Sequence, residues 1–211
     1  MDPARFDPHA VVAEVIGGAA SGLGRPPRSI VLVEGRSDQA ALETLARRRD
    51  WDLVDRGVAV VPMGGAQALP RFLDRLGVGS ASTRVAGLCD AHEERDVRRA
   101  LARAGLGADL TRAEMEARGF FVCEVDLEDE LIRALGPAAV EAIIAEQGEL
   151  GTLRTFQRQP AQRGRPLVAQ LRRFMGTRSG RKLQYATALV DALDLARVPR
   201  PLDAVLAHAC T

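Results

Sequence analysis

The sequence predicts an α/β fold in which four mainly parallel strands form one sheet flanked by helices, with a helical C-terminal extension. Strand-like apolar runs alternate with amphipathic helical segments up to residue 135, and the pattern beyond is helical. No hairpin signal joins neighbouring strands, which favours parallel pairing through helical crossovers. The chain has 211 residues, 46% of them apolar, which is enough for one ordinary core.

The first strand and helix bring two acidic residues together. An apolar, β-branched run at 30–33 predicts a buried strand, which stops at Glu34. Ser37 is a favourable N-cap for a helix at 37–49. Asp38 then falls in the first helical turn, close in space to Glu34. Buried acids are costly without a cationic partner, so a divalent metal is the leading candidate.

Two further strand–helix units follow. A strand at 57–61 leads through the Pro-Met-Gly-Gly segment at 62–65 into a helix at 66–76. This segment lacks the GxxxxGK[ST] pattern of nucleoside-triphosphate loops, so we expect a tight turn below the acidic site. A third strand at 83–89 precedes a charged helix at about 92–104.

The rest of the chain adds one strand and several helices. Thr111 and Glu114 have capping-box spacing and predict a short helix at 111–118, before a fourth strand at 120–125. Further helices are expected at about 8–20, 128–135, 137–147, 166–175, 182–195 and 201–209. The expected organisation is an N-terminal helix and loop at 1–27, an α/β core at 28–135, and an arginine-rich helical region at 136–211 packed on that core.

Composition argues against a membrane or secreted protein. No apolar run reaches the roughly 18 residues of a membrane span, and the N-terminus lacks the features of a secretory signal. The three cysteines contain no CxxC pair, and Cys89 and Cys123 lie in strand-like runs. We expect both to be buried, reduced thiols in a cytoplasmic protein.

Carboxylates follow three of the four predicted strands: Glu34, Asp90, and the pair Asp126 and Glu128. The carboxyl ends of parallel strands share one edge of the sheet, so these acids can form one cluster. Hard oxygen ligands suit Mg²⁺ or Mn²⁺. Taken singly, each acid can instead be a helix cap or a solvated loop residue.

Three segments of the chain carry the strand ends and helix starts described above: VLVEGRSDQAALETLA, VVPMGGAQALPRFLDRL and VAGLCDAHEE. Together they resemble a TOPRIM domain, the acidic metal-binding α/β domain of topoisomerases, bacterial primases and OLD-family (overcoming lysogenization defect) nucleases. The Glu-Gly pair, the aspartate four residues after that glutamate, the Pro-x-Gly-Gly turn and the later Asp-Leu-Glu motif are closest to the OLD-type branch. The similarity extends over roughly residues 28–195, and the chain also resembles small stand-alone TOPRIM proteins.

The resemblance implies a role for each matching residue. Glu34 would be the catalytic glutamate, acting as metal ligand or general acid/base. Asp38, Asp90 and Asp126 would be metal ligands, while Glu128 would complete a second metal position. Lys182 would steady the scissile phosphate or the charge on the leaving group. It is the only lysine beside 28 arginines, which suggests a site that prefers a compact point charge, although a chance surface lysine is the alternative.

The second acidic motif departs from the family pattern. The usual Asp-x-Asp is here Asp90-Ala91-His92. Imidazole in place of a carboxylate weakens a Mg²⁺ site and favours Mn²⁺. His92 is therefore a candidate substitute ligand, a phosphate contact or a solvated residue, and Glu93 or Glu94 could supply the missing carboxylate. The number of metals stays open.

Residues 151–190 carry eight arginines and Lys182 but no acidic residue. This charge predicts contacts with nucleic-acid phosphates, with a solvated arginine-rich surface as the alternative. The candidate nucleic-acid-binding residues are Arg163, Arg165, Arg172, Arg173, Arg178 and Arg181. Since only 4% of residues are aromatic, base stacking on single strands is not expected.

The predicted function is metal-dependent cleavage of nucleic acid, as a DNA endonuclease or nickase with DNA preferred over RNA. One alternative is a non-catalytic nucleic-acid-binding or regulatory module, which His92 favours. Another is a nucleotidyl transferase or a hydrolase of small phosphoesters. OLD-type nucleases usually join TOPRIM to an ATPase domain, and this sequence has no Walker A motif. A separate ATPase partner is therefore a candidate, as is a homodimer.

Overall fold

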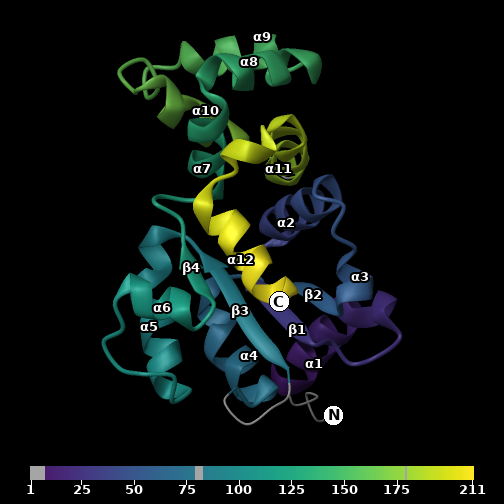
Figure 1. Ribbon diagram of the computed structural model, residues 1–211. Coiled ribbons are helices and arrows are strands. Elements are labelled where there is room, and N and C mark those ends of the chain that lie inside the picture. Colours follow the sequence, from purple (N-terminus) through teal and green to yellow (C-terminus); the bar gives the residue numbers. More distant parts are fainter. Residues whose placement is uncertain (1–7, 79–82, 179) are drawn as a thin grey trace, which may run out of the picture.

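The computed structural model describes residues 8–78, 83–178 and 180–211, and its centre is a four-stranded, all-parallel sheet (Figure 1). The strands are β1 (Ser29–Val33), β2 (Val58–Pro62), β3 (Arg84–Cys89) and β4 (Phe120–Val122), in the order β2-β1-β3-β4. Val33 lies opposite Pro62, Leu32 opposite Gly87, and Cys89 opposite Val122. This register places the carboxyl ends of all four strands at one edge, in agreement with the prediction from the sequence.

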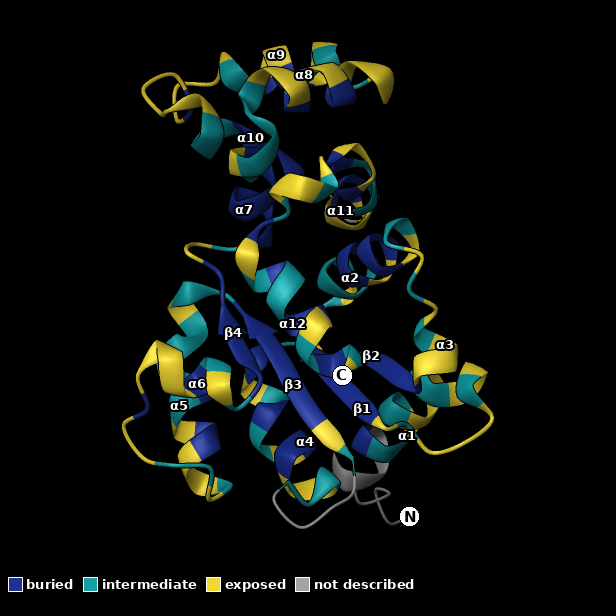
Figure 2. Cartoon of the chain, viewed as in Figure 1, coloured by how far each residue is buried: buried dark blue, intermediate teal, exposed yellow. Residues whose placement is uncertain are grey.

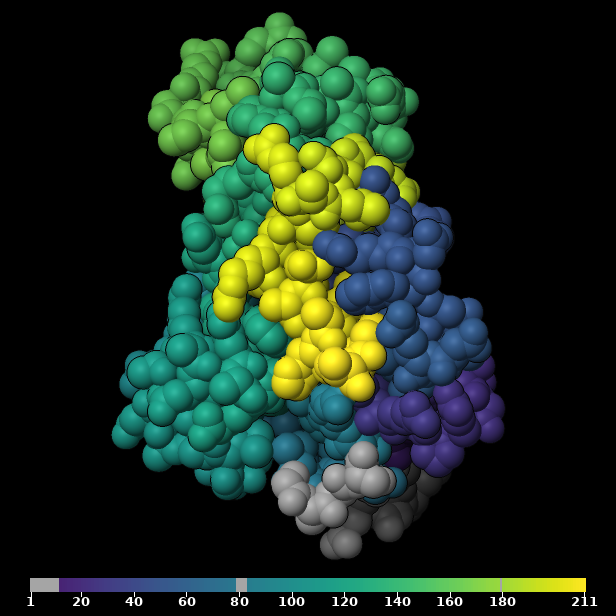
Figure 3. All heavy atoms as spheres, viewed as in Figure 1, coloured from purple at the N-terminus to yellow at the C-terminus, as the bar shows by residue number. Residues whose placement is uncertain are grey.

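Helices cover both faces of the sheet. One face carries α2 (Arg36–Arg48), α11 (Arg181–Ala192) and α12 (Arg200–Cys210), whose apolar residues join the core on that side. The other carries α1 (Pro8–Ala20), α4 (Leu69–Leu76), α5 (Glu94–Arg103) and α6 (Arg112–Ala117). In the space-filling view the C-terminal segment, in yellow, lies against α2, in blue (Figure 3).

The chain leaves β4 through a group of four helices. They are α7 (Leu127–Leu135), α8 (Pro137–Glu146), α9 (Leu150–Gln157) and α10 (Leu167–Met175). Figure 1 shows α8, α9 and α10 gathered at the end of the molecule far from α1. The apolar sides of all four continue the core that lies under α2 and α11.

The strands alternate between two apolar layers. Val31 and Val33 of β1 face the α2 side, while Ile30 and Leu32 face the α4 side. All five residues of β1 are buried, which explains why its sequence is almost continuously apolar (Figure 2). Cys89 and Cys123 are buried free thiols, as expected. Within residues 8–78, 83–178 and 180–211, no helix is long and apolar enough to cross a membrane.

The structure differs from the sequence predictions at several boundaries. Ser37 is not the N-cap of α2: the helix begins at Arg36 with Gly35 as N-cap. The Asp38 carboxylate instead accepts a hydrogen bond from the Gly35 N–H at 2.9 Å, which satisfies that donor. Two short helices were not predicted, α3 (Leu53–Arg56) and α9. Strand β4 is shorter than expected and ends at Val122.

Short 3-10 turns complete the described chain. They lie at Ser21–Leu23, Ala66–Ala68, Ala91–Glu93 and Leu195–Arg197. The turn at Ala91–Glu93 directly follows β3, and it therefore sets the direction of the side chains beside Asp90.

Candidate acidic site

Glu34 follows β1, and its backbone is fixed by the Gly64–Gly65 turn. The N–H groups of Gly64 and Gly65 both donate to the Glu34 carbonyl, at 2.9 and 3.0 Å. The two glycines have φ values of +76° and +121°, which residues with a Cβ rarely adopt. The predicted tight turn below the acidic site is therefore confirmed.

Asp38 lies in the first turn of α2, beside Glu34. Burial raises its pKa to about 6, with further increases from Glu128 and Glu34, while the hydrogen bond from Gly35 opposes the shift. Asp38 therefore acts both as a helix cap and as a member of an acidic group.

Asp90 follows β3 and has the same kind of environment. Burial raises its pKa to about 8, and the negative charges of Asp38, Asp126 and Glu34 add to the shift. Acids from three different strand ends thus act on one another electrostatically, as expected from the strand order. In the part of the chain that the structure describes, no cationic side chain forms an ion pair with Asp38 or Asp90.

Asp126 and Glu128 begin α7. Asp126 is the N-cap and accepts a hydrogen bond from the Asp129 N–H at 2.9 Å, while its other oxygen lies 3.4 Å from Arg172 Nε. Both residues project from the segment after β4. They add two carboxylates to the group formed by Glu34, Asp38 and Asp90.

Lys182 reaches this group from the start of α11. Its Nζ lies 3.1 Å from Glu128 Oε2; the Glu128 side chain is only 7% exposed and that of Lys182 is 52% exposed. Burial raises the pKa of Glu128 in spite of the lysine. Burial opposes the charge on Lys182, but Glu128 and the other acids outweigh it, so its pKa is raised as well. The only lysine therefore lies at the acidic site as a half-exposed cation.

The three candidates for the acid missing after Asp90 are His92, Glu93 and Glu94, and each has different surroundings. His92 is exposed. Glu94 is bound to two arginines: it accepts from Arg98 and, at 3.0 and 2.8 Å, from Arg112. Glu93 lines a small cavity together with Glu34, and its Oε2 is buried with no hydrogen-bond partner among the described residues. Burial is the main cause that raises the pKa of Glu93, followed by the charge of Glu34.

The carboxylates of the acidic site are the type of ligand that a hard divalent cation prefers, although they do not converge on one point. Over the described ranges, no three His, Cys, Asp or Glu side chains are grouped closely enough to hold a metal ion. The site nevertheless offers several carboxylates with raised pKa values and the orphaned Oε2 of Glu93. Oxygen ligands of this kind match Mg²⁺ and Mn²⁺.

The arginine-rich segment divides into paired and unpaired side chains. Arg181 is buried and forms a two-point pair with Glu149, with its Nη2 2.8 Å from Oε1, so it is removed from the candidate nucleic-acid contacts. Arg172 pairs with Asp126, and Arg178 lies 3.5 Å from Glu149. Three arginines are exposed and have no carboxylate partner in the described part of the chain: Arg163, Arg165 and Arg173.

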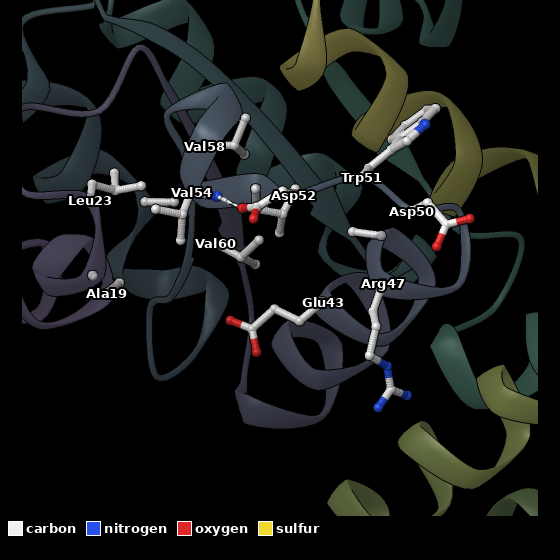
Figure 4. A pocket seen from close by; sticks show the side chains of 14 residues that line it. Ala19, Leu23, Glu43, Arg47, Asp50, Trp51, Asp52, Val54, Val58 and Val60 are labelled. Atoms are coloured by element: carbon white, nitrogen blue, oxygen red, sulfur yellow. Dashed lines mark hydrogen bonds between the residues drawn. The ribbon is translucent and has the colours of Figure 1, made fainter.

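A hollow of about 560 Å³ lies beside β2 (Figure 4). Its lining includes Trp51, Val54 and Val60 together with the carboxylate of Glu43. None of the acidic-site residues lines it, so we assign it no part in the proposed chemistry.

A family model described as overcoming lysogenization defect protein-like, TOPRIM domain, matches residues 28–90. This match contains Glu34, Asp38 and Asp90. Residues 28–90 of this chain therefore resemble the TOPRIM domain of the OLD family. The positions of Asp126 and Glu128 lie outside the match, and their place beside the other acids comes from the structure.

Solved structures agree with the TOPRIM assignment at the level of the fold. The C-terminal region of the Xanthomonas campestris pv. campestris OLD protein, phased with platinum, is 23% identical with a TM-score of 0.65, covering 87% of this chain and 92% of that one. The C-terminal region of the Burkholderia pseudomallei OLD protein is 20% identical with a TM-score of 0.61, covering 87% and 96%. No curated protein matches the sequence.

Proposed function

We propose that this TOPRIM protein is a divalent-metal-dependent nuclease that cleaves phosphodiester bonds in nucleic acid, with DNA preferred over RNA. One observation carries the proposal: Lys182, 54 positions from Glu128 in the sequence, lies 3.1 Å from its carboxylate. A cation from α11 and acids from three strand ends thus occur at one edge of the sheet. Acids that hold metal, beside a cation that faces phosphate, are what phosphodiester cleavage requires.

The residues divide into two roles. Glu34, Asp38 and Asp90 would hold one ion, while Asp126 and Glu128 would serve a second position. A bound Mg²⁺ or Mn²⁺ supplies Lewis-acid polarisation of the phosphate and lowers the pKa of an attacking water. Glu34 accepts or returns the proton of that water. Lys182 opposes the negative charge that develops on the phosphate and the leaving oxygen.

The nucleic acid would meet the protein through its backbone. Arg163 and Arg165 lie between α9 and α10, where each Nε donates to a backbone carbonyl, at 2.7 and 2.9 Å. Their outer guanidinium nitrogens stay available to phosphate oxygens, and Arg173 on α10 is exposed as well. Such contacts bind with little sequence preference and weaken steeply with salt. A separate ATPase partner and self-association stay predictions.

The test uses purified protein with supercoiled plasmid, linear duplex DNA and RNA, in Mg²⁺, in Mn²⁺ and in EDTA. We expect metal-dependent nicking or cutting of plasmid, lowered at least about 10²-fold by Glu34→Gln because the proton acceptor is lost. Glu43→Gln is the matched control, since Glu43 is an exposed glutamate on α2 that accepts a hydrogen bond from Gln39 and lies away from the acids. Absence of cleavage in both metals, or equal cleavage by Glu34→Gln, contradicts the proposal.

A non-catalytic nucleic-acid-binding module is the second candidate. It is favoured by His92 in place of an acid and by the absence, within the described ranges, of an assembled metal-binding group. Calorimetry separates the two: DNA binding without binding of either metal would favour the module over the nuclease.

A further inference from the structure

We infer that Glu93 is the carboxylate that replaces the acid missing at position 92, and that it is a metal-binding residue of the acidic site. The inference rests on the proposed function, because it concerns the same metal position. It selects one of three neighbouring side chains that the sequence alone could not rank.

The turn after β3 decides which side chain faces the acids. Residues Ala91–Glu93 form a 3-10 turn in which the Glu93 N–H donates to the Asp90 carbonyl at 3.1 Å. Glu93, three positions after the N-cap Asp90, is half-buried and lines a cavity with Glu34, whereas His92 is exposed. The acid needed beside Asp90 is consequently found at position 93.

The surroundings of Glu93 are those of a cation ligand that lacks its cation. Glu93 and Glu34 both line a small cavity with Leu32, Gly87 and Cys89. One carboxylate oxygen of Glu93, Oε2, is buried without a hydrogen-bond partner in the described parts of the chain. An unsatisfied buried oxygen is costly, and so is a second carboxylate beside the first. A divalent cation would relieve both costs at once.

Neither neighbour can take this role as the side chains are placed. Both oxygens of Glu94 are engaged, one by Arg98 and the other by Arg112 at 2.8 Å. The hydrogen bond from Arg112 is the main cause that lowers the pKa of Glu94, so its charge is already compensated. His92 lies exposed on the same 3-10 turn.

The decisive measurement is calorimetric titration of EDTA-treated protein with Mn²⁺ and with Mg²⁺, which needs no activity. We expect Glu93→Gln to weaken metal affinity by at least about 10–100-fold, the loss typical even of outer-shell partners. Glu94→Gln and His92→Asn, the neighbouring controls, should change it less than about threefold, because Glu94 is already paired with two arginines and His92 is exposed. Circular dichroism establishes that each variant is folded, and Glu93→Asp, which keeps the charge, should retain part of the affinity.

The outcomes separate this inference from the proposed function. If the wild-type protein binds neither metal, the proposed function fails and the inference with it. If the wild type binds metal and Glu93→Gln binds it equally well, only the role of Glu93 is overturned. Greater loss in Glu94→Gln or His92→Asn than in Glu93→Gln would assign the missing ligand to that neighbour instead.

Discussion

Replacing Asp90 with asparagine should stabilise the metal-free protein. In the native state burial and four neighbouring acids raise the pKa of Asp90 from its usual 3.8 to about 8. A raised carboxyl pKa means that ionisation opposes folding: the penalty is absent below the unfolded pKa and grows as the pH rises toward 8. At about 1.4 kcal/mol per pKa unit, the upper limit is about 5–6 kcal/mol. Because Asp90 is partly exposed, solvent screening lowers the expected gain to about 1–3 kcal/mol at pH 8.

Urea unfolding in EDTA at pH 5 and pH 8 measures this effect. The gain from Asp90→Asn should be larger at pH 8, because there the unfolded wild-type chain is stabilised most by ionising this carboxyl. Asp191→Asn is the control, because Asp191 is an exposed residue of α11 whose carboxylate pairs with Arg47 at 2.7 Å. That variant should change the free energy of unfolding by less than about 0.5 kcal/mol at either pH. Equal stability of wild type and Asp90→Asn at pH 8, or a loss in the variant, would refute the reasoning.

Two other predictions concern the cationic residues. Replacing Arg163, Arg165 and Arg173 together with glutamine should make the dependence of duplex-DNA affinity on salt less steep. In a fluorescence titration, the slope of log affinity against log salt should fall by about 2–3, at about 0.9 per lost phosphate contact. Arg99→Gln is the control and should leave the slope unchanged, because Arg99 is an exposed arginine of α5 that pairs with Asp96. Arg181→Met should lower the free energy of unfolding by about 3–5 kcal/mol, because the carboxylate it pairs with loses a buried partner. An unchanged midpoint in urea would show that this buried pair does not hold the start of α11.

Part of the acidic site could be predicted because it follows from local pattern and sheet geometry. Apolar runs end at Glu34 and at Asp90, and parallel strands bring their carboxyl ends to one edge, so the sequence alone suffices to group these two acids. The tight turn at Gly64 could be predicted for a similar reason, since two glycines follow closely after a strand.

Other features are decided by backbone geometry and long-range contacts, which the local sequence pattern does not specify. Asp38 and Ser37 are both good helix-capping residues, and only the backbone decides that Asp38 caps Gly35. Arg181 lies in the same arginine-rich stretch of sequence as exposed arginines, and nothing in that stretch distinguishes it from them. It is nevertheless buried against Glu149, 32 positions earlier. Glu93 and Glu94 are adjacent identical residues, and the 3-10 turn alone gives them different partners.

The packing of two helices explains how Lys182 reaches acids so distant in sequence. Arg48, at the end of α2, donates to the carbonyls of Val190 and Leu193, at and just beyond the end of α11, at 2.7 and 2.6 Å. The two helices have 13 and 12 residues and pack with their C-terminal ends together. Their N-terminal ends therefore lie at the same edge of the sheet, one carrying Asp38 and the other Lys182.

This parallel arrangement gives the edge two opposed electrostatic features. The N-terminal ends of α2 and α11 carry partial positive charge, which favours anions such as phosphate. The strand ends supply carboxylates, which favour cations. A phosphodiester and a divalent metal can therefore be attracted to the same edge by different groups. Since α11 is anchored at Arg181 and Lys182 is the next residue, the buried pair with Glu149 fixes the cation relative to the acids.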